Sequence, residues 1–170
     1  MAKSALQKEL GKKQPFACRE QEVALNLLRT ADVLSREGHA LFERYGLSGP
    51  QFNVLRILRG HRDTGLPCQR IVAEMVTQTP DITRLVDRLE AAGLVRRQRT
   101  EADRRLVLVH VTAAGLTLLA RLDEPILALH RAQMAHLSVD ELTELNRLLV
   151  KLRQPAEKPV AAVKHKARSL

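Results

Sequence analysis

The sequence is poor in aromatic residues and in cysteine. Aromatic residues make up 2% of the 170 residues, with three phenylalanines, one tyrosine and no tryptophan. Proteins that grip single-stranded nucleic acid stack its bases on aromatic side chains, so this class of function is disfavoured. The two cysteines, Cys18 and Cys68, cannot form the disulfide framework of a small secreted domain.

Long apolar runs are also missing. No stretch reaches the roughly 18 consecutive apolar residues that a membrane-spanning helix needs, so we expect no membrane partner. Residues 1–17 contain four lysines but no apolar run of the kind found in a signal peptide. The expected compartment is therefore the cytoplasm.

Positive charge and aliphatic residues are abundant. The chain has 28 Lys and Arg against 19 Asp and Glu, a net charge of +9, and 45% of its residues are hydrophobic. This apolar fraction is enough for a folded core. A basic chain with few aromatics is suited to double-stranded DNA, where phosphates provide affinity and base edges provide sequence preference.

The pattern of apolar residues divides the chain into four parts. Residues 1–19 are predicted to be a basic, flexible arm, and residues 154–170 a disordered basic tail. Residues 20–45 and 113–153 have helical periodicity, typical of helices that pack on other helices. Residues 46–112 contain shorter elements and form a separate predicted domain.

Capping signals place the elements of this domain. Ser48 is predicted to cap a second helix, and a third helix is expected over residues 67–75. Thr79 followed by Pro80 predicts the start of a fourth helix that continues to about residue 92 and stops at Gly93. Two short strands, 94–100 and 106–112, are expected to follow, joined by a polar turn.

The C-terminal helical region carries leucine stripes that one small domain cannot bury. Pro125 interrupts the first stripe and should kink or divide that helix. Ser138 and Glu141 have the spacing of a capping box and open the last helix. Because these stripes need partners, we expect a homodimer.

The fourth helix has one apolar face and one polar face. Ile82, Leu85, Val86 and Leu89 share the face that must pack inward, and Arg84 lies nearly opposite them. Two helices joined by a tight turn and followed by a basic hairpin are typical of the winged helix-turn-helix. The predicted fold is mainly α with a small β-hairpin wing, and the helix fits the major groove of DNA.

Arginines crowd the predicted hairpin. Such a ribbon can place arginine in the minor groove, where narrow A·T-rich DNA concentrates negative potential. The alternative is a solvated hairpin whose charges only protect a sheet edge from aggregation. The arginines are Arg96, Arg97, Arg99, Arg104 and Arg105.

Several short motifs together resemble the MarR family of bacterial transcription regulators. They are DITRLVDRLE (81–90), GLVRR (93–97), DRR (103–105) and VTAAG (111–115), preceded by YGLS (45–48) and QFNVL (51–55). The family's wing pattern, D-x-R followed by a strand and L-T-x-x-G, is met by Asp103, Arg105, Thr112 and Gly115, with Val111 in place of leucine. The resemblance covers about residues 20–153.

The resemblance implies a dimeric regulator, often a repressor, that binds an inverted-repeat operator. It also implies release by a small aromatic or phenolic acid bound between the dimer helices and the winged domain, without a cofactor. By motif match, Arg88 would contact phosphate, Arg105 would reach the minor groove, and Asp103 would pair with an arginine. The residues that would face the bases are Thr79, Asp81, Thr83 and Arg84.

Three other functions stay open at this stage. Cys18 lies at the start of the first long helix, where oxidant-sensing members of the family carry their reactive thiol. The chain could instead coat DNA by charge alone, or be an enzyme or ligand carrier with a borrowed fold. The histidines lack metal-ligand spacing, and Gly46-Leu47-Ser48-Gly49 is not a nucleophile elbow, so neither a metal nor an enzyme is expected.

Overall fold

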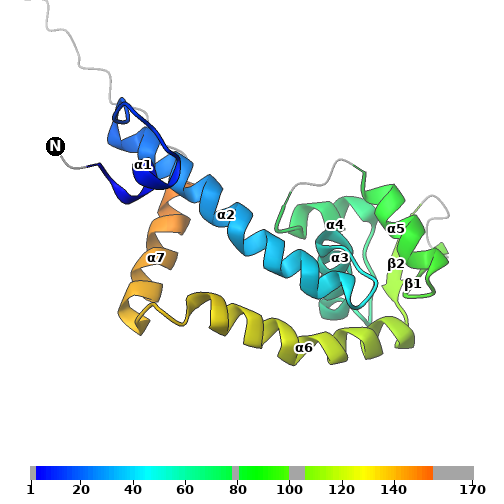
Figure 1. Cartoon of the computed structure of the whole chain (residues 1–170). Coiled ribbons are helices and arrows are strands. Elements are labelled where there is room, and N and C mark those ends of the chain that lie inside the picture. The colour runs from blue at the N-terminus through cyan, green and yellow to red at the C-terminus, as the bar shows by residue number, and fades with distance from the viewer. Residues whose placement is uncertain (1–2, 78–80, 100–105, 155–170) are drawn as a thin grey trace, which may run out of the picture. The chain divides into compact units, whose positions relative to one another are not determined.

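A computed structural model describes residues 3–77, 81–99 and 106–154 (Figure 1). These residues form seven helices and two strands, and the mainly helical prediction is confirmed. The chain divides into two units, Met1–Gln133 and Met134–Leu170, which we describe separately. The elements are α1 (Ala5–Glu9), α2 (Arg19–Glu43), α3 (Gly49–Gly60), α4 (Cys68–Glu74), α5 (Ile82–Ala91), β1 (Val95–Arg99), β2 (Val107–Val111), α6 (Ala113–Met134) and α7 (Val139–Leu152).

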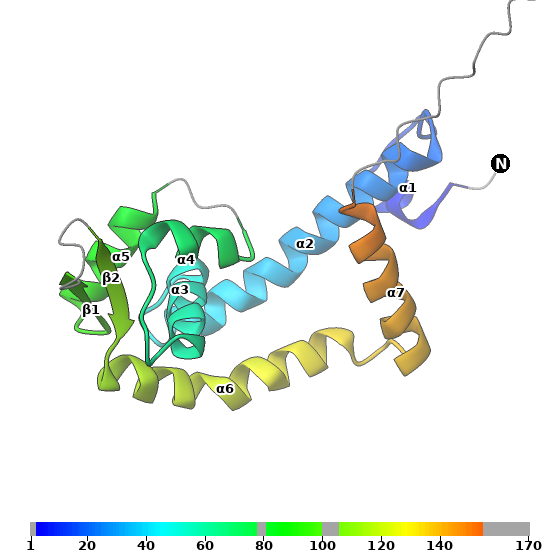
Figure 2. The same cartoon turned by 180° about the vertical axis from the view of Figure 1, so that it is seen from behind.

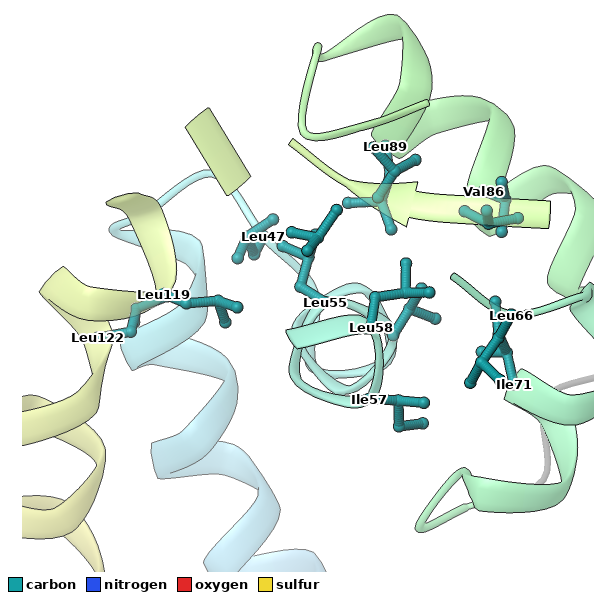
Figure 3. Close-up of a cluster of buried hydrophobic side chains, with 14 residues drawn as sticks. Leu47, Leu55, Ile57, Leu58, Leu66, Ile71, Val86, Leu89, Leu119 and Leu122 are labelled. Atoms are coloured by element: carbon teal, nitrogen blue, oxygen red, sulfur yellow. The ribbon is translucent and has the colours of Figure 1, made fainter. Parts of the chain in front are cut away.

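The hydrophobic core lies in the winged helix-turn-helix domain and is centred on α3. Figure 3 shows Leu55 and Leu58 of α3 between Val86 and Leu89 of α5 on one side and the first turns of α6 on another. All four side chains are fully buried. The apolar face that the sequence predicts for the fourth helix is therefore packed inward, with Val86 and Leu89 deepest.

Local sequence fixes the beginning of α3. Ser48 accepts a hydrogen bond from the Gln51 backbone N–H, and the Gln51 side chain accepts one from the Ser48 N–H, which forms a capping box. Gly46, just before it, has φ of 69°, a conformation that glycine adopts without strain. The sequence predicted both the cap and the glycine turn.

The start of α5 differs from the prediction. The N-cap is Asp81, whose carboxylate accepts a hydrogen bond from the Arg84 backbone N–H at 3.0 Å, and the helix begins at Ile82. Prediction of Thr79 as the cap was wrong, because an aspartate two residues later caps equally well. Thr79 and Pro80 themselves lie outside the described residues.

The wing is an antiparallel pair in which Val95 lies opposite Val111 and Arg99 opposite Val107. A further bridge joins Leu66 to Val109, with both backbone hydrogen bonds formed, at 2.8 and 3.0 Å. An isolated bridge of this kind has no periodic signal that a sequence pattern could show.

A short N-terminal helix, α1, replaces part of the predicted flexible arm. Ser4 caps it, and Leu6 within it is only 2% exposed. Glu9 pairs with Arg29 of α2 at 2.9 Å. The sequence predicted a flexible arm here and gave no sign of this helix, because a five-residue helix is stabilised by tertiary contacts and has little signal of its own.

The long helices α2 and α6 both leave the winged domain (Figures 1 and 2). Of the two predicted effects of Pro125, a kink or a division, the division does not occur, because helix α6 runs without a break through this residue. A proline removes only one backbone hydrogen bond from a helix whose other bonds remain. Near the end of α6, the Gln133 amide donates to the Leu34 carbonyl and to Glu37 of α2, at 3.2 and 3.1 Å.

Helix α7 belongs to the second unit. The capping box predicted for Ser138 and Glu141 is confirmed. Its apolar residues remain accessible, and no residue of α7 is buried within the described part of the chain. Among the described residues, no helix has both the length and the apolar character needed to cross a membrane.

Candidate nucleic-acid interface

Helix α5 presents a polar face to solvent. Thr83, Arg84, Asp87 and Arg88 are exposed, whereas Val86 and Leu89 on the opposite face are fully buried. This division confirms the amphipathic helix that the sequence predicts. A helix anchored by one face can enter a major groove with the other, and its N-terminal end favours nearby phosphate.

The first turn of α5 holds Arg84 in one place. The second oxygen of the Asp81 carboxylate lies 3.0 Å from Nε of Arg84, while the first caps the helix. The Arg84 side chain remains 80% exposed. Both oxygens of Asp81 therefore have partners within the protein, whereas the sequence analysis expected this side chain to face the bases.

A buried asparagine fixes the approach to α5. Asn53 of α3 is 8% exposed, and its side-chain oxygen accepts a hydrogen bond from the Val76 backbone N–H at 2.8 Å. This bond satisfies a buried amide and holds the segment that follows α4. Sequence reasoning missed this role, although a polar residue next to the apolar positions Val54 and Leu55 was a visible signal.

The strand β1 is tied to α5 by Arg97. Its guanidinium lies 2.6 Å from Asp87 and 2.5 Å from Glu90, and its backbone N–H donates to Glu90 at 2.8 Å. Burial acts to lower the pKa of Arg97, but the hydrogen bonds and charges of the two carboxylates outweigh it and raise the pKa. The wing is thus tied to α5 by a charged cluster of three residues, Arg97, Asp87 and Glu90.

The other wing arginines are only partly described. Arg96 and Arg99 are exposed, and Nη1 of Arg96 donates to Gln98 at 2.5 Å. Three further residues that the sequence predicts to belong to the DNA-binding wing lie outside the described residues. They are Asp103, Arg104 and Arg105.

The T-x-x-G motif joins the wing to α6. The Thr112 hydroxyl donates to the Gly93 carbonyl at 2.7 Å and accepts from the Gly115 backbone N–H at 3.2 Å. A Cβ on Gly115 would collide with the Leu94 carbonyl oxygen and would lie 2.8 Å from Val111. The motif therefore has a packing role, because only glycine lets α6 begin this close to the strand end.

The two cysteines have different surroundings. Cys18 is exposed and is the N-cap residue of α2, without a side-chain capping hydrogen bond, whereas Cys68 at the start of α4 is half-buried. Burial raises the pKa of the Cys68 thiol, and nearby Arg97 opposes this shift. Cys68 is therefore held as the thiol, the less reactive form. Within the described ranges, no group of three His, Cys, Asp or Glu side chains is arranged to hold a metal ion.

The helix-turn-helix, the exposed arginine face of α5 and the basic wing together define a winged helix-turn-helix DNA-binding protein. A model of the MarR family matches residues 45–106, which include α3, α4, α5 and β1. The HTH-type transcriptional regulator MgrA of Staphylococcus aureus is 35% identical over 112 residues, which are 66% of this chain and 74% of MgrA. The chain belongs to the MarR family of transcriptional regulators, and it is a DNA-binding regulator rather than an enzyme.

Solved structures have the same fold. A MarR transcription factor from Planctomyces limnophilus matches with a TM-score of 0.63 and 42% identity, over 80% of this chain and 98% of that one. A mutant of MarR from E. coli, complexed with operator DNA, matches with a TM-score of 0.65 and 24% identity, over 77% of this chain and 96% of that one. The predicted winged helix-turn-helix fold is confirmed.

Proposed function

We propose that this regulator is a homodimeric repressor that reads an inverted-repeat operator through α5 and its wing. The observation that carries the proposal is the orientation of α5, which buries Val86 and Leu89 and leaves Arg84 and Arg88 exposed. The E. coli protein in the similar solved structure is complexed with operator DNA. A dimer would place two such helices about one duplex turn apart.

In this proposal, the exposed residues of the interface have separate tasks. Thr83 and Arg84 face the bases, and Arg88 contacts phosphate. Arg97 takes a different role from the one expected, since its guanidinium is engaged by Asp87 and Glu90; it positions the wing. At the DNA, Arg105 enters the minor groove and Thr79 lies near the bases, with Arg96, Arg99 and Arg104 adding positive charge.

The homodimer is supported by apolar side chains that the single chain leaves accessible. In α2, Val23 and Leu28 are 56% and 67% exposed, and in α7, Leu148 and Leu152 are 47% and 59% exposed. Large apolar side chains left exposed along a helix are typical of an interface. A second copy of the same chain would bring the same helices, and a twofold axis then matches an inverted repeat.

We also propose that a small aromatic acid releases the repressor from DNA. A groove of about 430 Å³ lies between α2 and α6. Its aliphatic walls suit an aromatic ring, and the Arg44 guanidinium suits a carboxylate. The lining residues are Glu37, Ala40, Leu41, Arg44, Pro125, Ala128, Leu129 and Ala132.

Selection from random DNA tests the main proposal. The full chain is mixed with duplexes that contain a randomised core, and bound molecules are sequenced after several rounds. We expect an inverted repeat whose half-site centres lie about 10 base pairs apart. Retention of all duplexes without any enriched sequence would support a DNA-coating protein, and failure to retain any duplex would contradict the proposal.

Release is tested on the selected duplex with 4-hydroxybenzoate as the probe. We expect the acid to weaken binding by the wild type and to act less on Arg44→Gln, because the variant lacks the cation for the carboxylate. Equal effects on both proteins would contradict the role of Arg44. The oxidant alternative is tested by peroxide on wild type and Cys18→Ser, where equal release by both excludes this thiol as a sensor.

A further inference from the structure

Asp81 has two simultaneous contacts with Arg84. One carboxylate oxygen accepts from the Arg84 backbone N–H at 3.0 Å, and the other lies 3.0 Å from the side-chain Nε. The Asp81 carboxylate therefore contacts both the backbone and the guanidinium of Arg84. Among the described residues, the terminal nitrogens of Arg84 have no acceptor, and the side chain is 80% exposed.

We propose that Asp81 is a positioning residue that makes Arg84 selective for guanine. The inference rests on the proposed function, in which α5 enters a major groove. An arginine has one N–H on Nε and four on its terminal nitrogens. Nε of Arg84 forms an ion pair with the Asp81 carboxylate, so the terminal nitrogens keep two donors for a base, and Arg84 loses less rotamer freedom when it binds one.

Two donors on the terminal nitrogens of Arg84 fit guanine and not adenine. Guanine presents two acceptors, O6 and N7, in the major groove, whereas adenine presents one acceptor beside an amino donor. An arginine that is free to rotate can find other partners, including phosphates. The ion pair with Asp81 restricts the orientation of the Arg84 guanidinium, so Arg84 distinguishes guanine from other bases more strongly.

The negative charge of Asp81 is unfavourable near DNA, so its presence at this position needs an explanation. A helix can be capped by serine, threonine or asparagine with no net charge. A carboxylate that approaches a DNA groove is repelled by the phosphates, and the repulsion is reduced when an arginine pairs with it. Asp81 is 48% exposed at the end of α5 that would enter the groove. The ion pair with Arg84 offsets this unfavourable charge and orients the Arg84 side chain.

A different role for Asp81 would be to read DNA itself. A carboxylate can accept a hydrogen bond from the amino group of cytosine. Both oxygens of Asp81 are engaged within the protein, which favours orientation of Arg84 over direct contact. The two roles predict changes at different base pairs, so experiment separates them.

The test compares base preferences of the wild type, Asp81→Ser, Arg84→Ala and the double variant on random duplex libraries. Serine retains the helix cap and removes the contact with Nε. Asp140→Ser is the matched control, since Asp140 is an exposed aspartate in the first turn of α7. A second measurement replaces guanine by 7-deazaguanine, which lacks the N7 acceptor.

We expect the wild type to select guanine at a position where Arg84→Ala loses the preference. Asp81→Ser should weaken that same preference by about five- to tenfold and leave the other positions unchanged. The double variant should match Arg84→Ala, and 7-deazaguanine should penalise the wild type more than Asp81→Ser. Asp140→Ser should keep the wild-type profile.

Two results would overturn the inference while the proposed function stands. One is an Asp81→Ser profile that equals that of the wild type, and the other is a change at a base pair that Arg84→Ala does not affect, which would indicate direct reading. If the wild type itself enriches no sequence, the proposed function fails and the inference fails with it.

Discussion

The winged domain and the helices α2 and α7 use their apolar residues in opposite ways. Five of the 12 residues of α3 are buried, whereas none of the 25 residues of α2 or the 14 residues of α7 is buried in the described chain. The winged domain therefore has a core of its own, which holds α5 in position. The helices α2 and α7 have apolar residues that only another surface can cover.

The largest expected effects come from changes in the two kinds of apolar residue. Leu55→Ala removes a fully buried side chain and should cost about 2–5 kcal/mol of unfolding free energy at every protein concentration. Leu145→Asp in α7 should leave the winged domain folded but weaken dimerisation by at least about 3 kcal/mol, more than a hundredfold.

Denaturation at several protein concentrations, together with sedimentation, measures both effects. The comparison fails if Leu145→Asp lowers stability by the same amount at all concentrations and the protein stays dimeric. It also fails if the loss of unfolding free energy caused by Leu55→Ala changes with protein concentration.

The second prediction concerns the junction between the wing and α6. Gly115→Ala should destabilise the winged domain by about 1–3 kcal/mol, because the added Cβ meets the Leu94 carbonyl and the Val111 side chain. Gly60→Ala is the control, since a Cβ there has no atom within 4 Å among those described. It should stabilise the protein by less than about 1 kcal/mol. Thermal unfolding of both variants measures these changes. Equal changes in stability would show that the close contacts at Gly115 do not destabilise the alanine variant.

The third prediction concerns Arg97. Arg97→Met leaves Asp87 and Glu90 without their cation, so we expect a loss of about 1–2 kcal/mol in stability and weaker binding to all duplexes. Arg96→Met removes the same charge from an exposed position and should weaken DNA binding with little effect on unfolding. Equal midpoints of urea unfolding for the two variants would contradict the locking role of Arg97.

The smallest expected effect is a dependence of stability on pH. Burial lowers the pKa of His110 below its ordinary value of 6.5, and the positive charge of Arg96 lowers it further. The unfolded chain then binds a proton more readily than the folded one, so stability should fall as the pH drops below about 6.5. His110→Gln should reduce this part of the pH dependence, as urea unfolding at pH 7.5 and 5.5 would show; an unchanged dependence would count against it.

Sequence reasoning succeeded where a local signal decides the structure. The cap at Ser48, the capping box at Ser138 and the apolar face of α5 depend on spacing within one helix, and all three are confirmed. Roles that depend on partners distant in sequence were missed. Asn53 meets Val76 only after α3 and α4 have packed.

The candidate site shows the same limit. The sequence identified an arginine-rich wing, but it could not distinguish Arg97, which meets two carboxylates of α5, from the exposed Arg96 beside it. Side chains alternate across a strand, and which face meets the helix is set by packing. For Asp81, the sequence predicted a side chain that faces the bases, whereas in the structure both carboxylate oxygens lie beside Arg84.

The most direct test of the whole account is the affinity of Arg84→Ala and Arg88→Ala for a selected duplex and for a scrambled one, measured by fluorescence anisotropy at one salt concentration. The account predicts that Arg84→Ala loses about 1–3 kcal/mol on the selected duplex and little on the scrambled one. Arg88→Ala should weaken both about equally. If Arg84→Ala weakened both duplexes alike, Arg84 would not read bases, and the central claim about α5 would be contradicted.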